Sequence, residues 1–163
     1  MPKEYCVYEN ISVTYNGKTS ELDNIVVGPT GIFIFEVKNH KGIISGDYDE
    51  KDWFQEKMGR YGRIYYEKFY NPVKQVKTHI YRLANYLKEN GIHTYIEGIV
   101  LFTNEESSVN ITGTGEVPFF SLANDDEKNL LLYIENRPYK MERKQIDKAK
   151  NLVIKLQESN EVV

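Results

Sequence analysis

Two tight-turn signals near the N-terminus divide the chain into three runs of strand-forming residues. Asn16-Gly17 is typical of a two-residue hairpin turn, and Gly-Pro-Thr-Gly at 28–31 separates the second run from the third. The runs 5–14, 20–27 and 32–38 are rich in β-branched and aromatic residues. They predict three consecutive antiparallel strands, which places the N-terminal part of the chain on a sheet.

The middle of the chain predicts a crossover helix. Residues 42–54 indicate a short extra hairpin, whereas residues 55–70 have no clean period and are expected to form a long loop. Asn71-Pro72 is a helix-start signal, and apolar residues then recur at spacings of three and four up to Asn90-Gly91. A buried strand is expected over 95–102.

Two further helices are expected at about 125–135 and 143–157. The fold class predicted is therefore α/β: a mixed central sheet with an antiparallel three-strand meander, followed by helix, strand and C-terminal helices. A length of 163 residues, with 40% hydrophobic and 28% charged residues, fits one domain over 1–163.

Composition limits where such a chain works and what it binds. The apolar runs are too short to span a bilayer and no secretory pattern opens the chain, so we expect an unexported, cytoplasmic protein with no membrane partner. The single cysteine, Cys6, fits a reducing compartment. A net charge of −3 argues against nucleic-acid binding through bulk charge. The segment 55–82, however, has seven basic and two acidic residues.

The strand registers follow from the two turns. If the second turn pairs Val27 with Ile32, opposing residue numbers sum to 59, so Asp23 faces Glu36 and Glu21 faces Lys38. The same arithmetic around Asn16-Gly17 places Asn10 beside Asp23. Directly opposed side chains lie about 4.5 to 5.5 Å apart at Cβ.

Two carboxylates directly opposed on a sheet repel each other unless a cation or proton lies between them. Magnesium suits oxygen ligands, and a neighbouring lysine can orient or deprotonate a water that attacks a phosphodiester. The alternative is a solvated sheet face on which a Glu21–Lys38 ion pair only fixes the register. A lone Glu-x-Lys tripeptide is common and does not decide between them.

A family resemblance adds to this pattern. It is carried by Glu-Leu-Asp-Asn-Ile-Val-Val at 21–27, Gly-Ile-Phe-Ile-Phe-Glu-Val-Lys-Asn at 31–39, Gly42, Gly46 and Trp53. These residues resemble the nuclease-related domain, NERD, of the PD-(D/E)XK nuclease superfamily. Asn71-Pro72, Gln75 and a strand at 96–102 follow in the same order. The resemblance covers about 5–103 and leaves a C-terminal helical extension at about 121–159.

The resemblance implies a restriction-endonuclease-like core with a metal-dependent phosphodiesterase site. Asp23 and Glu36 would be metal ligands, Lys38 the catalytic lysine and Gln75 an accessory residue. The backbone carbonyl of Val37 could complete a site for Mg²⁺ or Mn²⁺.

One difference from the family pattern concerns the first helix. Family members have a helix before the first strand that supplies another acidic residue, whereas this sequence starts a few residues before its first strand. We expect that helix to be lacking, with Glu21 as the nearest substitute carboxylate. Because Glu21 is also expected to pair with Lys38 in the metal-free chain, we predict weak metal affinity and low activity.

The leading hypothesis is a metal-dependent nuclease-like domain that hydrolyses phosphodiester bonds of DNA or RNA. The alternative is a non-catalytic nucleic-acid- or protein-binding module with a degenerate site, and a weaker third reading is a structural interaction domain. Aromatic and basic residues interleave over 53–70, as on a single-strand-binding surface, although the aromatics could equally pack on the sheet. The residues expected to contact nucleic acid are Arg60, Arg63, Lys74 and Lys77.

The remaining candidates carry no expected chemistry. His40 and His93 are expected in surface loops and His79 at an exposed helix position.

Without its first helix the sheet would be partly uncovered, which favours a homodimer.

Overall fold

The N-terminal meander forms as the two turns predict. A computed structural model describes residues 3–161 and places strands β1 (Cys6–Tyr15), β2 (Lys18–Gly28) and β3 (Gly31–Lys38) side by side and antiparallel. Asn16 (φ 54°) and Gly17 (φ 77°) adopt the left-handed conformations that a tight hairpin requires. The predicted registers are confirmed where the strands pair, because Tyr15 pairs with Lys18 and Val27 with Ile32, but the pairing of β2 with β3 ends at Asn24 and Phe35.

Helix α1 (Pro72–Glu89) is followed in the chain by strand β7 (Ile96–Phe102). The side chain of Asn71 accepts a hydrogen bond from Val73 N at 2.8 Å, which caps the helix at the predicted start. Strand β7 pairs in parallel with β3, and β9 (Phe119–Ser121) adds in parallel to β7. The resulting five-stranded sheet has the order β1-β2-β3-β7-β9, a mixed sheet as expected.

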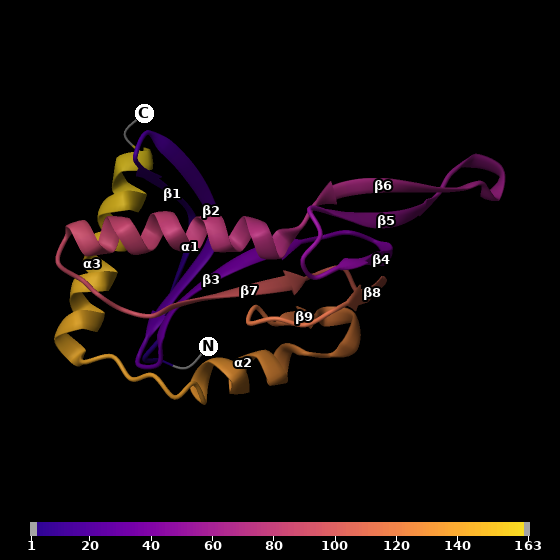
Figure 1. Ribbon diagram of the computed structural model, residues 1–163. Helices are drawn as coiled ribbons and strands as arrows, with labels where there is room; N and C mark the ends of the chain where they lie inside the picture. The colour runs from indigo at the N-terminus through magenta and orange to yellow at the C-terminus, as the bar shows by residue number, and fades with distance from the viewer. Residues whose placement is uncertain (1–2, 162–163) are drawn as a thin grey trace.

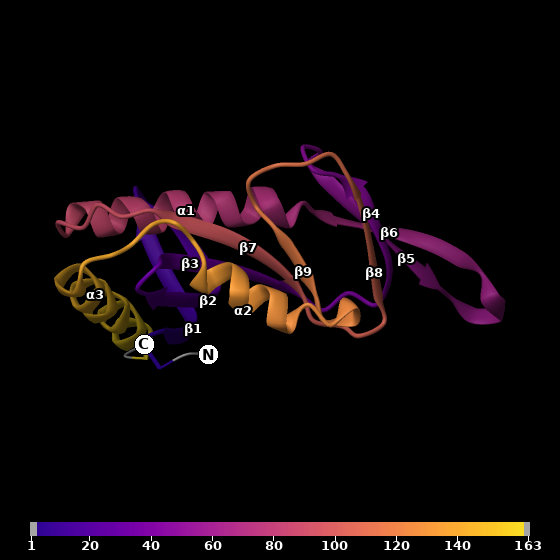
Figure 2. The ribbon, with the colours of Figure 1, turned by 90° about the horizontal axis from the view of Figure 1, so that it is seen from below.

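The two faces of this sheet are covered by different helices. Helix α1 and α3 (Arg143–Glu161) pack on one face, in a core that includes Ile34, Leu83 and Val153, whereas α2 (Glu127–Glu135) packs on the other with Phe33 and Phe35. Figure 2 shows α1 and α2 on opposite sides of β7. The expected C-terminal helices are thus confirmed. Within residues 3–161, no helix is long and apolar enough to cross a membrane.

The stretch expected to be a long loop is a strand hairpin instead, and that prediction is wrong. Strands β5 (Asp52–Met58) and β6 (Ile64–Tyr70) pair over their whole length, with a short 3-10 turn η1 (Arg60–Gly62) between them. With β4 (Gly42–Asp47) and β8 (Ser107–Thr112) they form a second sheet in the order β6-β5-β4-β8. We call residues 52–70 the arm, because they extend away from the rest of the molecule (Figure 1).

The arm shows no alternation of apolar and polar residues, because most of its side chains are exposed to solvent. All of β6 except Phe69 is exposed. Only its base is anchored: Trp53 is fully buried, donates a hydrogen bond from Nε1 to Asp47 O at 2.8 Å and meets Phe119 edge to face at 5.4 Å. Gly46 is required there, because an added Cβ would lie 2.6 Å from the Trp53 ring.

Candidate functional site

Glu36 follows a run of buried apolar residues in β3, a strand that is covered on both faces. Its neighbours on the same face of β3, Ile32 and Ile34, belong to the core beneath α1, and Glu36 itself is only 3% exposed. A carboxylate buried to this extent is costly unless charged or hydrogen-bonding groups compensate it. Its surroundings therefore define the first candidate site.

Two basic side chains lie against the two oxygens of Glu36. Lys38 Nζ is 3.3 Å from Glu36 Oε1, and His79 Nε2 is 3.3 Å from Glu36 Oε2. Lys38 Nζ also donates a hydrogen bond to Gln75 Oε1 at 3.1 Å. Gln75 and His79 are four residues apart, so both reach the site from the same face of α1. We call Glu36, Lys38, Gln75 and His79 the carboxylate cluster.

His79 was not expected in this cluster. The prediction that it is an exposed helix residue is wrong, because it is 7% exposed and lies under the helix against Glu36. The signal that could have found it is its spacing: a residue four positions after Gln75 must share the face of Gln75. His40 and His93, by contrast, lie in loops as expected, half-buried and exposed respectively.

Asp23 lies where β2 and β3 separate. The pairing of these strands ends at Asn24 and Phe35, one position before the expected Asp23–Glu36 pair. There the Asp23 side chain takes the place of the next backbone partner, since its Oδ2 accepts a hydrogen bond from Val37 N at 2.9 Å. Asp23 and Val37 line a shallow hollow of about 310 Å³ together with Glu9, Asn10 and Asn24.

Glu21 does not join either group. The expected ion pair between Glu21 and Lys38 is wrong: Glu21 is exposed and accepts a hydrogen bond from Ser12 Oγ, whereas Lys38 contacts Glu36 and Gln75. The cause is the splaying of β2 from β3 beyond Asn24, which takes Glu21 away from the end of β3. Glu21 contacts its other neighbour, β1, instead.

The residues expected to bind nucleic acid fall in two places. Arg60 and Arg63 lie at the exposed tip of the arm. Lys74 and Lys77 lie on the first turns of α1, where Lys77 Nζ is 5.5 Å from the centre of the Tyr48 ring. Any shared ligand would have to reach from the helix start to the arm tip.

The donor atoms fit a divalent cation in part. Glu36 Oε2 is buried and has no hydrogen-bond partner, and neither does His79 Nε2, which faces it. Such atoms, with the carboxylate of Asp23 and the carbonyl of Val37, are of the kinds that metal ions bind. However, no group of three or more His, Cys, Asp or Glu side chains in residues 3–161 is arranged to hold a metal ion.

The comparisons with known proteins identify the family of the chain. The family model described as "Nuclease-related domain" (NERD) matches residues 1–103, more than half of the chain. The chain belongs to this nuclease-related domain family, whose general context is the PD-(D/E)XK superfamily.

An uncharacterized protein of Bacillus anthracis is 38% identical over 82 residues, which are 48% of this chain and 35% of that protein. The match thus spans about a third of the relative's length. No solved structure matches the chain significantly.

Proposed function

We propose that this chain is a metal-dependent nuclease domain that hydrolyses phosphodiester bonds of DNA or RNA. The observation that carries the proposal is the carboxylate cluster: a buried Glu36 whose two oxygens lie against Lys38 and His79, in a chain of the nuclease-related domain family. We place the protein in the cytoplasm.

The roles proposed for the residues follow from their atoms. The carboxylates of Asp23 and Glu36 and the carbonyl of Val37 would hold Mg²⁺ or Mn²⁺, which supplies charge neutralisation at the phosphate and makes water more acidic. Lys38 Nζ would orient the attacking water or hold a phosphate oxygen. Gln75 fixes Lys38 through its hydrogen bond, and His79 lies against the second oxygen of Glu36. Glu21 is left as an accessory residue outside the cluster.

A cleavage assay tests this proposal. Wild-type protein is incubated with supercoiled plasmid and with single-stranded DNA and RNA, in magnesium or manganese and in chelator. We expect products that form with either metal and are absent in chelator. Identical product in chelator would contradict a metal-dependent site.

One observation favours a second function, a binding module with a degenerate site. The described residues hold no group of three metal-binding side chains, and the ammonium group of Lys38 already contacts the carboxylate of Glu36. In that case the chain binds nucleic acid or a protein but produces no metal-dependent cleavage.

The expected homodimer stays a prediction. It was expected because part of the sheet would be uncovered, but α3 packs on β1 and β2 and covers that part of the sheet.

If the arm tip contacts phosphates, binding should depend on salt through Arg60 and Arg63. We expect the double variant Arg60→Gln/Arg63→Gln to reduce the slope of log affinity against log salt concentration by about 1.4 to 1.8. The reason is that binding releases fewer counterions from the nucleic acid when two phosphate contacts are lost. Fluorescence anisotropy over a salt series measures this slope. The matched variant Lys74→Gln/Lys77→Gln reports on the helix start, and an unchanged slope in the arm variant would show that its cations are only solvated.

A further inference from the structure

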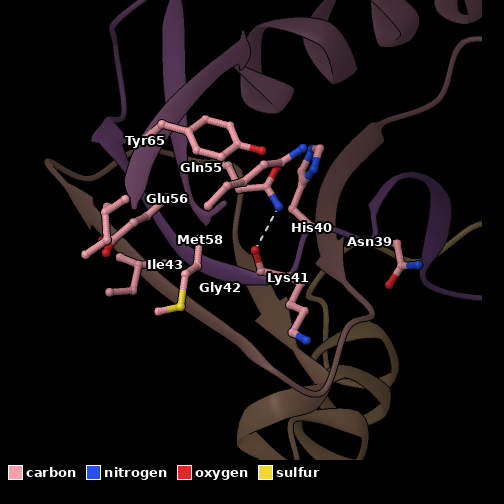
Figure 3. A pocket seen from close by; sticks show the side chains of 11 residues that line it. Asn39, His40, Lys41, Gly42, Ile43, Gln55, Glu56, Met58 and Tyr65 are labelled. Atoms are coloured by element: carbon pink, nitrogen blue, oxygen red, sulfur yellow. Dashed lines mark hydrogen bonds between the residues drawn. The ribbon is translucent and has the colours of Figure 1, made fainter. Parts of the chain in front are cut away.

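A groove opens directly after the strand that carries the carboxylate cluster. It lies between the β3–β4 connection and the arm and has a volume of about 630 Å³, within the usual range of ligand pockets. Only Asn39 separates Lys38 from His40, which lines the groove. The groove is also lined by Lys41, Ile43, Met58 and Tyr65 (Figure 3), and by Lys57 and Ile64.

Large apolar side chains are exposed around this groove. Met58 is 74% exposed, Ile64 52%, Tyr65 44% and Ile43 41%. Apolar side chains gathered around one hollow mark a binding surface more often than isolated ones do. One wall is held in place, because the His40 ring packs on Phe69 with centroids 4.3 Å apart. The Gln55 side chain beside it donates a hydrogen bond to Lys41 O (Figure 3).

Cations surround the same hollow. Lys41 and Lys57 line it, each in an ion pair at the rim, with Glu106 at 3.0 Å and Glu67 at 2.6 Å. Burial lowers the pKa of His40, and the nearby cations Lys38 and Lys57 lower it further, although Glu67 acts in the opposite sense. Glu56 is the acidic residue of the lining. Lys38 and Lys57 are thus the cations closest in effect to His40.

We propose that this groove binds an unpaired nucleotide of a single-stranded DNA or RNA whose backbone continues to Lys38. The inference rests on the proposed nuclease function and names the class of its substrate. An aromatic and apolar lining suits the face of a base, and the flanking lysines suit its phosphates. In a duplex the base faces are covered by stacking, so a nucleotide must be unpaired to enter such a groove.

The arm offers a matched pair of residues for the test. Tyr65 lines the groove, whereas its neighbour Tyr66, 63% exposed, lies outside the lining. Both rings are exposed, so neither substitution removes core packing. Tyr65→Phe keeps the ring and removes only the hydroxyl.

Binding is measured by fluorescence anisotropy in chelator, where no metal-dependent cleavage can occur. The probes are a fluorescein-labelled single-stranded oligonucleotide, as DNA and as RNA, and the DNA duplex of the same sequence. We expect wild type to prefer the single strands. Tyr65→Ala should weaken that binding by about five- to one-hundred-fold, the range for loss of one base-stacking ring. Tyr65→Phe and Tyr66→Ala should stay within about two-fold of wild type.

Three results would overturn the proposal. They are equal affinity for duplex and single strand, unchanged binding by Tyr65→Ala, and an equal loss in Tyr66→Ala. A protein that binds no probe, but whose oligomeric state by light scattering changes in Tyr65→Ala, would make the groove a protein interface instead. Because the assay contains no metal, loss of single-strand binding is distinguished from failure of the cleavage chemistry.

Discussion

Replacing Lys38 with alanine is expected to lower metal-dependent cleavage by at least about 100-fold, the lower range for loss of a group that positions or transfers a proton in the transition state. Lys38 Nζ is the ammonium group that contacts Glu36, and its bond to Gln75 fixes its direction. Its side chain is 20% exposed, so it can meet both the buried carboxylate and a substrate. No other residue of the cluster carries an ammonium group.

Lys88→Ala is the matched control for that measurement, because Lys88 is exposed and lies thirteen residues along α1 from Gln75, outside the carboxylate cluster and the groove. We expect its cleavage rate to stay within about three-fold of wild type, since a solvated charge about 20 Å away along the helix is screened. Initial rates at saturating substrate separate an effect on chemistry from an effect on binding. Full activity in Lys38→Ala would remove the lysine from the mechanism, and equal losses in both variants would indicate a general charge effect.

Trp53→Ala is expected to lower the free energy of unfolding by about 3 to 5 kcal/mol, as for other large aromatic residues removed from a core. Trp53 is fully buried at the base of the arm. Its Nε1 donates a hydrogen bond to the carbonyl of Asp47 at the end of β4, and its ring packs on Phe119 of β9. The substitution leaves a cavity between the two sheets and removes the hydrogen bond to Asp47 O. Urea denaturation followed by circular dichroism measures the loss.

Two variants show whether that loss comes from the buried ring. Trp53→Phe keeps an aromatic ring and should cost less than Trp53→Ala. Phe54→Ala removes the next residue, which points to the opposite face of the arm and is 42% exposed, and we expect a change within about 0.5 kcal/mol. A loss below about 1 kcal/mol in Trp53→Ala would mean that the arm base is not part of the cooperative core.

Local turn chemistry made the meander and its register predictable. Asn16-Gly17 and the turn at 28–31 each fix which residues face one another, and the pairs 15–18 and 27–32 agree with those assignments. The start of α1 was predictable for the same reason, because Asn71 caps the helix within two residues. The position of Glu36 beneath α1 follows from strand alternation together with that helix.

The remaining features depend on contacts that local patterns do not record. The arm beyond its base is mostly exposed, so neither the period of a strand nor that of a helix stands out in residues 55–70. Lys38 contacts Glu36 instead of the expected Glu21, because β2 and β3 stop pairing at Asp23. This separation of the strands lies away from both turns, so turn signals do not predict it. His79 enters the cluster only through the packing of α1 on the sheet.

The central claim is that Glu36 binds a divalent cation, and calorimetric titration of the protein with manganese tests it most directly. We predict weak binding, with a dissociation constant of about 10⁻³ M or larger, as for oxygen sites of low charge. The heat should be lost in Glu36→Gln and kept in Glu21→Gln, because Glu21 contacts Ser12 outside the cluster. No binding heat in wild type, or the same heat in Glu36→Gln as in wild type, would contradict the claim.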